Sequence, residues 1–358
     1  MSSPFDPVHF ASGSTMHNRF MVAPMTNLQS HEDGTLSNEE YVWLVKRAEG
    51  GFGLVMTCAS HVDPGGKGFP GQLGCWSDDH LPGLTRLAAG INAFGSLSVI
   101  QLHHAGRRSP LDLIEGVPVA PCDDFETGAR ALTTGEVEEL VESFIAAAVR
   151  AERAGFSGVE LHGAHDYILC EFLNASFNER TDRYGGSHEN RFRIFEEIIA
   201  GIRARCRPDF WLGVRLSPER FGLATSDVLD AFTHLVALNT VDLIDVSLWD
   251  TFKEATDEEF EGQPLLGLFT ALERGSTRLA VAGHLYTGDD VTRALGEGVD
   301  VVALGRAAIT NHDFPEILRE DPHASMRALP VARATLGAEG LGPAFIEYMS
   351  TWKGFVGT

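Results

Sequence analysis

A histidine pair and a permanent cation are the residues of this sequence whose types and spacing suggest chemistry. His162 and His165 follow one apolar run three positions apart, and Arg215 lies near the end of another. Two imidazoles at this spacing can donate hydrogen bonds to one oxygen or bind a metal ion, and the sequence places no third ligand nearby. Other unusual residues that end apolar runs are Pro24-Met25-Thr26, Ala59, Gln101, Gly283 and Gly305-Arg306.

These apolar runs have the length and composition of short buried strands, and longer amphipathic segments separate them. This alternation is typical of βα units around a parallel sheet. Eight units favour closure into a TIM (β/α)8 barrel, although periodicity alone does not exclude a doubly wound sheet. On a closed barrel the residues named above converge on one pocket. The predicted strands are 20–25, 53–59, 97–102, 158–161, 211–216, 242–247, 279–283 and 300–304.

The segments between the predicted strands carry helix start and stop signals. Ser37 with Glu40, and Thr133 with Glu136, are candidate capping boxes that precede apolar residues at helical spacing. A similar stripe runs from 81 to 94, and glycines follow all three segments. Three connections after strands are long and belong on the carboxyl-end face of a barrel, where such enzymes do their chemistry. They are 105–132, 163–190 and 248–264.

No linker or repeat beyond the βα unit interrupts the chain, so we expect one domain over residues 1–358. Residues 321–358 match no pattern, and we expect them to pack at the end of the barrel or at a subunit contact. The sequence leaves the oligomeric state open, a homo-oligomer included.

Charge and cysteine usage exclude several classes of protein. With 28 basic and 50 acidic residues, the net charge of −22 disfavours nucleic acid and membrane surfaces as partners, although a local basic pocket can still bind a phosphate. The five cysteines are scattered and contain no CxxC, which argues against a disulfide framework, a zinc site or an iron–sulfur site. No signal pattern or membrane-spanning run is present, so we expect a cytoplasmic protein.

Several stretches of the sequence together resemble the Old Yellow Enzyme family, in its order and spacing, from about residue 5 to about residue 320. The most distinctive is RTDRYGGSHENR (180–191), which we interpret as architecture. The resemblance implies a barrel that binds FMN tightly and non-covalently, takes hydride from NADH or NADPH, and reduces small α,β-unsaturated carbonyl compounds. The other matching stretches are NRFMVAPMT (18–26), QLHHAGR (101–107), HGAHDY (162–167), GVRLS (213–217), AVAGHL (280–285) and ALGRAAITNHDF (303–314).

The resemblance also implies a cofactor site. Arg215 is similar to the residue that balances the negative charge of reduced FMN near N1 and O2, although an ion pair inside the barrel is an alternative. Gln101 matches an amide at the pyrimidine edge, and Thr26 a hydroxyl that donates towards flavin O4; either side chain alone also fits a loop-fixing role. The implied site is completed, around the phosphate and along the strand ends, by Pro24, Met25, Ala59, Ala282, Gly283, Gly305 and Arg306.

On the substrate side, the resemblance implies that His162 and His165 hold the carbonyl oxygen and that Tyr167 protonates the α-carbon. Metal binding by the histidines and simple packing by the tyrosine are the alternatives. His103 stands where some relatives place a tryptophan beside the substrate, and Leu28 where some place a tyrosine. Both departures concern substrate identity and leave the implied flavin site intact.

Of two further departures from the family pattern, Asp166 bears on substrate identity, as His103 and Leu28 do, and only His312 is expected to matter little. Asp166 occupies a position that is commonly glycine, and we expect it to cap the following helix and face solvent. If it pointed inward, it would favour the protonated form of His165. His312 replaces a frequent proline in a peripheral turn, and we expect little consequence.

Two other functions stay open from the sequence. A flavin barrel can reduce dienoyl thioesters or oxidise amines, but relatives with those roles carry an iron–sulfur cysteine cluster and an extra C-terminal domain. A flavin-binding protein without turnover is the second alternative, and it has no need of the proton donor that Tyr167 resembles.

Overall fold

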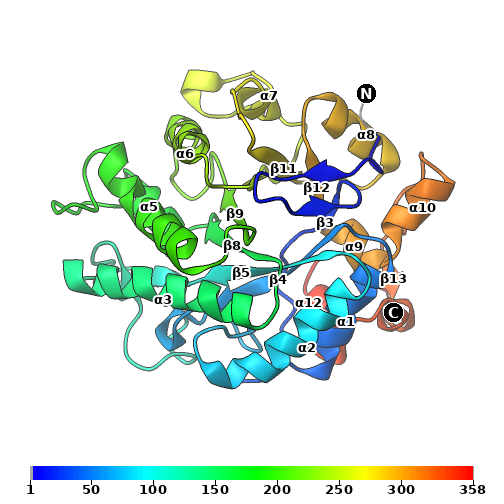
Figure 1. Cartoon of the computed structure of the whole chain (residues 1–358), viewed down its shortest axis with the longest axis horizontal. Helices are drawn as coiled ribbons and strands as arrows, with labels where there is room; N and C mark the ends of the chain where they lie inside the picture. The colour runs from blue at the N-terminus through cyan, green and yellow to red at the C-terminus, as the bar shows by residue number, and fades with distance from the viewer. Residues whose placement is uncertain (1–2, 358) are drawn as a thin grey trace.

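The computed structural model describes residues 3–357, and its centre is a closed barrel of eight parallel strands (Figure 1). The strands follow one another around the barrel in chain order, and the last pairs with the first through Val302 and Phe20. The predicted TIM barrel is therefore confirmed. The barrel strands are β3 (Phe20–Val22), β4 (Leu54–His61), β5 (Leu97–His103), β8 (Gly158–Gly163), β9 (Trp211–Leu216), β10 (Leu243–Ser247), β11 (Arg278–Ala282) and β12 (Val301–Leu304).

All eight predicted strands are present, and their bounds differ from the prediction by a few residues. The first ends at Val22 instead of residue 25. Pro24 explains this early end, because proline has no N–H to donate to a neighbouring strand. β4 and β5 continue further than predicted, to His61 and His103, so their last residues reach the rim of the barrel.

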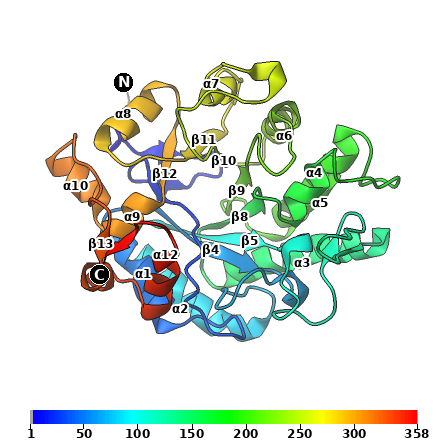
Figure 2. The ribbon, with the colours of Figure 1, turned by 180° about the vertical axis from the view of Figure 1, so that it is seen from behind.

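Helices surround the barrel in both views (Figures 1 and 2). The capping box of Thr133 and Glu136 is confirmed at the start of α3. The box of Ser37 and Glu40 is only half right, because Ser37 accepts from the Glu40 N–H while the Glu40 side chain turns inward. The helices are α1 (Asn38–Glu49), α2 (Leu81–Asn92), α3 (Thr134–Arg153), α4 (Ile168–Leu173), α5 (His188–Arg205), α6 (Thr225–Leu238), α7 (Leu265–Thr270), α8 (Gly288–Gly296), α9 (Arg306–Thr310), α10 (Phe314–Glu320), α11 (Arg333–Ala338) and α12 (Pro343–Ser350).

The two ends of the barrel are finished differently. The amino ends are covered by a hairpin of β1 (Val8–His9) and β2 (Thr15–Met16), where Phe10 packs edge-on against Trp211 at 5.8 Å between ring centroids. The carboxyl ends carry the long connections, which contain short elements of their own. These are β6 (Val119–Ala120), β7 (Arg130–Ala131) and the 3-10 turns η1 (Pro64–Gly66), η2 (Asp78–His80), η3 (Gly106–Arg108) and η4 (Glu258–Phe260).

The C-terminal segment, residues 331–357, packs against α1 (Figure 2). It contains α11 and α12 and ends in a short pairing of β13 (Val331–Ala332) with β14 (Val356–Gly357). Phe345 of α12 meets Trp43 of α1 edge-on, with 4.9 Å between ring centroids. Trp352 of the same segment lies at the carboxyl end of the barrel, which agrees with the first of the two expected places, and the expected subunit contact stays a prediction. Among residues 3–357, no helix has the length and hydropathy needed to cross a membrane.

Candidate active site

A cavity opens at the carboxyl ends of β3, β9, β10, β11 and β12, and it brings together most of the predicted cofactor residues. Pro24, Met25, Arg215, Ala282, Gly283, Gly305 and Arg306 all line it. Thr26, Ala59 and Gln101 do not line this cavity, and their predicted contacts with the cofactor stay predictions. The residues that sequence reasoning missed are Ala23, Ser247, Trp249, His284, Leu285, Tyr286, Ala303, Ile309 and Trp352.

The lining fits a ligand with an anionic head and a flat apolar body. A side chain at Gly283 would place its Cβ 2.8 Å from the backbone carbon of Trp249, and Gly283 has a φ of +150°. A Cβ at Gly305 would lie 3.4 Å from the sulfur of Met25. Glycine is therefore required at 283 by the close approach of the chain after β10, whereas a Cβ at 305 would make only ordinary van der Waals contact. Arg306, beside Gly305, supplies a cation for a phosphate.

Arg215 belongs to a buried polar cluster inside the barrel. Its Nε lies 2.9 Å from Oδ2 of Asp245 on β10. On the neighbouring strands, the Gln101 amide donates to Oε1 of Glu160 at 2.8 Å, and the second Glu160 oxygen has no hydrogen-bond partner among residues 3–357. Arg215 therefore does both things that the sequence allowed: it forms an ion pair inside the barrel and lines the cavity.

The protonation of Glu160 gives a testable dependence of stability on pH. Burial and the neighbouring Asp245 carboxylate raise the pKa of Glu160 to about 8. This pKa is higher than that of Glu160 in the unfolded chain, so the folded protein binds the proton more tightly. The stability that protonation of Glu160 contributes is therefore complete in acid and is lost as the pH rises towards about 8. We expect the Tm of Glu160→Gln minus the Tm of the wild type to be several degrees larger at pH about 9 than at pH about 5.

Thermal melts across that pH range check the expectation. Glu136→Gln serves as the control, because hydrogen bonds from Arg130 lower the pKa of this exposed carboxylate to about 2, so its charge is constant over the range. A Tm difference between Glu160→Gln and the wild type that stayed the same at every pH would contradict the raised pKa.

His162, His165 and Tyr167 bring their rings together beside the cavity. The ring centroid of His162 lies 5.1 Å from that of His165 and 5.0 Å from that of Tyr167. The two regions are connected by Ser247, which lines the cavity and whose Oγ is 3.0 Å from Nε2 of His165. Burial lowers the pKa of both imidazoles and raises the pKa of Tyr167. All three side chains are therefore uncharged near neutral pH.

One ring nitrogen in this group has no partner. Nδ1 of His162 is buried and accepts or donates no hydrogen bond among residues 3–357. A buried polar atom without a partner is costly, and such atoms commonly mark a ligand position. His162 is thus able to bind a ligand atom at the same place where Tyr167 is able to give a proton.

The backbone at His165 and Asp166 is in the left-handed conformation, with φ of 63° and 61°. Glycine adopts this conformation most readily, which explains why glycine is common at the Asp166 position in the family pattern. Our expectation for Asp166 was wrong: its carboxylate does not cap α4 but binds Arg107 with both oxygens, at 2.8 and 2.9 Å. The arginine follows β5 and is far away in the sequence. The ion pair holds Asp166 away from solvent, with 13% of the side chain exposed.

His103 packs against the ring of Tyr167, and Gln72 fixes which of its two ring nitrogens carries the proton. The Gln72 amide donates to Ala59 O at 2.8 Å and lies 3.0 Å from Nδ1 of His103, while its oxygen accepts from Gly68 N. Nδ1 must then accept, so the proton of the neutral ring is on Nε2. The His103 ring is fully buried, 4.3 Å from the Tyr167 ring centroid. Its contact with substrate stays a prediction.

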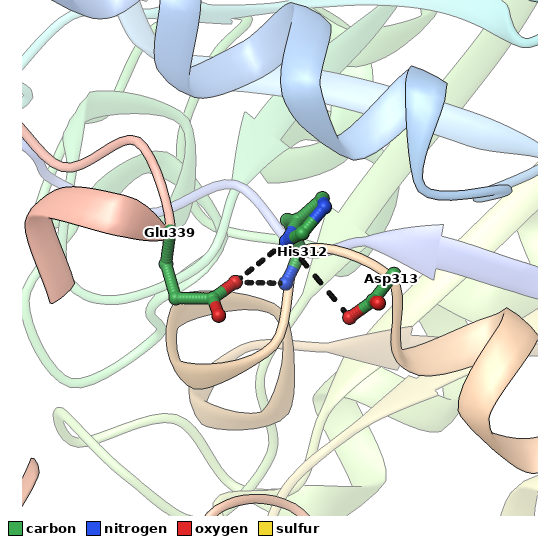
Figure 3. Close-up of side chains that lie close together, drawn as sticks. All are labelled: His312, Asp313 and Glu339. Atoms are coloured by element: carbon green, nitrogen blue, oxygen red, sulfur yellow. Dashed lines mark hydrogen bonds and ion pairs between the residues drawn. The ribbon is translucent and has the colours of Figure 1, made fainter. Parts of the chain in front are cut away.

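His312 has a structural role that we did not expect. Its Nδ1 lies 2.7 Å from Glu339 (Figure 3). The other oxygen of Glu339 binds Arg327 at 2.8 Å. Burial opposes ionisation of Glu339, but the hydrogen bonds from His312 outweigh it and lower the pKa of that carboxylate to about 2. Although Asp313 is close enough to complete a metal-binding set, both Glu339 oxygens are already occupied. The cluster ties the C-terminal segment to the barrel.

That segment brings Trp352 to the cavity, where the indole lies 5.4 Å from the guanidinium carbon of Arg306. We expect Trp352→Ala to weaken FMN binding by about 10-fold, because the aromatic wall beside the phosphate-binding cation is lost. Titration of the apoprotein with FMN, followed by flavin fluorescence, measures this effect. Phe125→Ala is the control, since Phe125 is 99% exposed. Equal affinity in wild type and Trp352→Ala would remove Trp352 from the site.

Comparisons with known proteins agree with this geometry. The model of the NADH:flavin oxidoreductase / NADH oxidase family matches residues 3–323. A probable NADH-dependent flavin oxidoreductase of Bacillus subtilis is 35% identical over 326 residues, which cover 88% of this chain and 87% of the relative. The solved Old Yellow Enzyme homologue from Zymomonas mobilis superposes with a TM-score of 0.80 at 26% identity, over 97% of this chain and 99% of that one. Morphinone reductase in complex with tetrahydroNAD gives 0.79 at 27% identity, over 94% of each chain.

Proposed function

We propose that this FMN-dependent NAD(P)H oxidoreductase reduces the activated C=C bond of α,β-unsaturated carbonyl compounds. The chain belongs to the NADH:flavin oxidoreductase / NADH oxidase family, which is the family of the Old Yellow Enzymes. The observation that carries this proposal is the convergence of two neutral imidazoles and one neutral phenol beside the cavity. A protein that only bound FMN would not need this arrangement. The unpaired, widely separated cysteines support a cytoplasmic location.

FMN, when bound, would supply the hydride chemistry that joins NAD(P)H oxidation to reduction of the alkene at its β-carbon. Arg215 is placed to balance the negative charge that accompanies reduction, and Arg306 with the backbone at Gly283 and Gly305 would hold the phosphate. Thr26 and Gln101 are assigned to the flavin edge by the family pattern alone.

The substrate oxygen would be held by His162 and His165. Their N–H groups polarise the carbonyl, so that electron density moves away from the β-carbon as the hydride arrives. Both imidazoles are neutral because burial lowers their pKa, and the charge of Arg215 lowers that of His165 further. A neutral imidazole donates a hydrogen bond without giving up its proton, which suits a carbonyl that must not be protonated fully.

Tyr167 completes the reaction by giving its phenolic proton to the α-carbon. Burial raises the pKa of Tyr167, so the group carries its proton at neutral pH. The phenolate left behind lies near the Arg108 guanidinium, whose carbon is 5.1 Å from the ring centroid, and it regains a proton from solvent. The overall change adds one hydride and one proton across the C=C bond.

A direct experiment tests the proposal. We expect the purified protein to be yellow, to release FMN on denaturation, and to consume NAD(P)H faster when 2-cyclohexen-1-one is added anaerobically, with cyclohexanone as product. A colourless protein that does not take up added FMN would contradict the cofactor assignment. A flavoprotein that formed no saturated ketone from any enone tested would contradict the ene-reductase proposal.

A further inference from the structure

Two arginines at the mouth of the barrel have no acidic partner. Arg108 is the last residue of η3, and Arg220 follows β9. No carboxylate oxygen of residues 3–357 lies within 4.0 Å of either guanidinium. The chain has 50 acidic and only 28 basic residues, and most of its other arginines form ion pairs. Arg108 and Arg220 are therefore exposed cations without an acidic partner among residues 3–357 of a strongly acidic protein, and unlike exposed Arg86 they lie at the carboxyl-end rim of the barrel.

The two guanidinium groups share one aromatic neighbour, Phe221, and Arg108 also contacts the ring of the proton donor Tyr167. The guanidinium carbon of Arg108 lies 5.1 Å from the Tyr167 ring centroid and 5.9 Å from that of Phe221. The guanidinium carbon of Arg220 is 5.6 Å from the same Phe221 centroid and 4.0 Å from that of Trp249. Stacking on aromatic rings restricts both cations while their N–H groups stay able to bind an anion.

Their field reaches the catalytic histidines. After burial and Arg215, the charges of Arg108 and Arg220 are the next causes that lower the pKa of His165. Arg108 also donates to the backbone oxygen of His165 at 2.7 Å. A negatively charged group on a ligand above Tyr167 would therefore meet two cations with no competing carboxylate of residues 3–357 in contact.

We propose that Arg108 and Arg220 bind an anionic substituent of the substrate, so that this enzyme prefers activated alkenes that carry a carboxylate. This inference rests on the proposed function. The phosphates of NAD(P)H offer the same charge, but a ribose separates them from the nicotinamide ring. The Arg108 guanidinium carbon lies 5.1 Å from the centroid of the Tyr167 ring, and this contact with the proton donor favours the substrate as the source of the anion.

The test uses the holoenzyme and a matched pair of enones, 4-oxo-2-pentenoate and its methyl ester. We expect the wild type to have the higher kcat/KM for the acid. Arg220→Ala should lower kcat/KM for the acid by about 10-fold and for the ester far less, whereas Arg108→Ala should slow both substrates, because Arg108 also lies beside Tyr167. Added salt should weaken the wild type's preference for the acid, because the contacts are near the surface.

Single variants separate charge recognition from a structural effect. Arg108→Ala also removes the hydrogen bond to His165 O, whereas Arg220 makes no side-chain hydrogen bond among residues 3–357, so Arg220→Ala is the cleaner variant. Arg220→Lys should recover part of the loss, and Arg205→Ala, at a remote exposed ion pair, should change neither substrate.

Three results would overturn the inference while the proposed function stood. The first is a wild type that prefers the ester. The second is an equal loss with acid and ester in Arg220→Ala. The third is a loss confined to flavin reduction by NADPH, which would assign the cations to the nicotinamide cofactor. Failure of both enones to react with the wild type would instead contradict the proposed function.

Discussion

Tyr167→Phe is expected to slow the reoxidation of the bound flavin by an enone about 100-fold or more, while flavin reduction by NAD(P)H changes by less than about 3-fold. The phenol contributes only a proton, and only the alkene needs one. Its raised pKa, which is caused chiefly by burial, keeps that proton on the oxygen at neutral pH. The ring of phenylalanine preserves the packing against His103 and His162, which lie 4.3 and 5.0 Å away between centroids.

Anaerobic stopped-flow measurement of the two half-reactions separates the roles. In the first, the oxidised protein is mixed with NAD(P)H; in the second, the reduced protein is mixed with 2-cyclohexen-1-one. Tyr41→Phe is a matched control, because it removes a phenolic oxygen from the outer helix α1, where the Tyr41 ring packs against Arg86. Equal slowing of both half-reactions by Tyr167→Phe would contradict the role of proton donor.

The second large effect is expected from His162→Ala/His165→Ala. Phenols bind to such sites as anions, so the wild type should bind p-chlorophenol with a long-wavelength charge-transfer band from stacking on the flavin. Removal of both imidazoles deletes two hydrogen bonds to the phenolate oxygen and should weaken binding by about 100-fold. Reduction of enones should fall at least as much, because the same bonds polarise the carbonyl.

The single variants divide that effect between the two rings. His162 has the buried nitrogen without a partner, whereas Nε2 of His165 lies 3.0 Å from Ser247 Oγ. We therefore expect His162→Ala to be the more damaging of the two. His234→Ala, on the outer helix α6, serves as the control. A charge-transfer band that survived in the double variant would show that the imidazoles do not bind the anion.

The parts of the site that the sequence predicted are those in which one short segment carries the relevant information. His162, His165 and Tyr167 fall within six residues at the end of β8, so their convergence follows from local spacing and from the barrel. The ends of the other strands meet at the same rim for the same reason, which placed Arg215, Gly283 and Gly305 correctly.

The predictions that were wrong or missing depend on partners far away in the sequence. Asp166 is a residue type that often caps a helix, and it stands just before α4. Its carboxylate is instead bound by Arg107, which belongs to another βα connection. The sequence alone gives His312 no role in its turn, because its partner Glu339 is far away in the sequence. Trp352 reaches the cavity only because the C-terminal segment folds back over the barrel. No periodicity or motif encodes such pairings.

The measurement that tests the central claim most directly is a single anaerobic turnover. The protein is reduced with one equivalent of NADPH per flavin and then mixed with 2-cyclohexen-1-one in the absence of oxygen. We predict that the visible absorbance of the oxidised flavin returns and that one cyclohexanone forms per flavin. A flavin that stayed reduced until air was admitted, with no saturated ketone formed, would contradict the assignment of this site to alkene reduction.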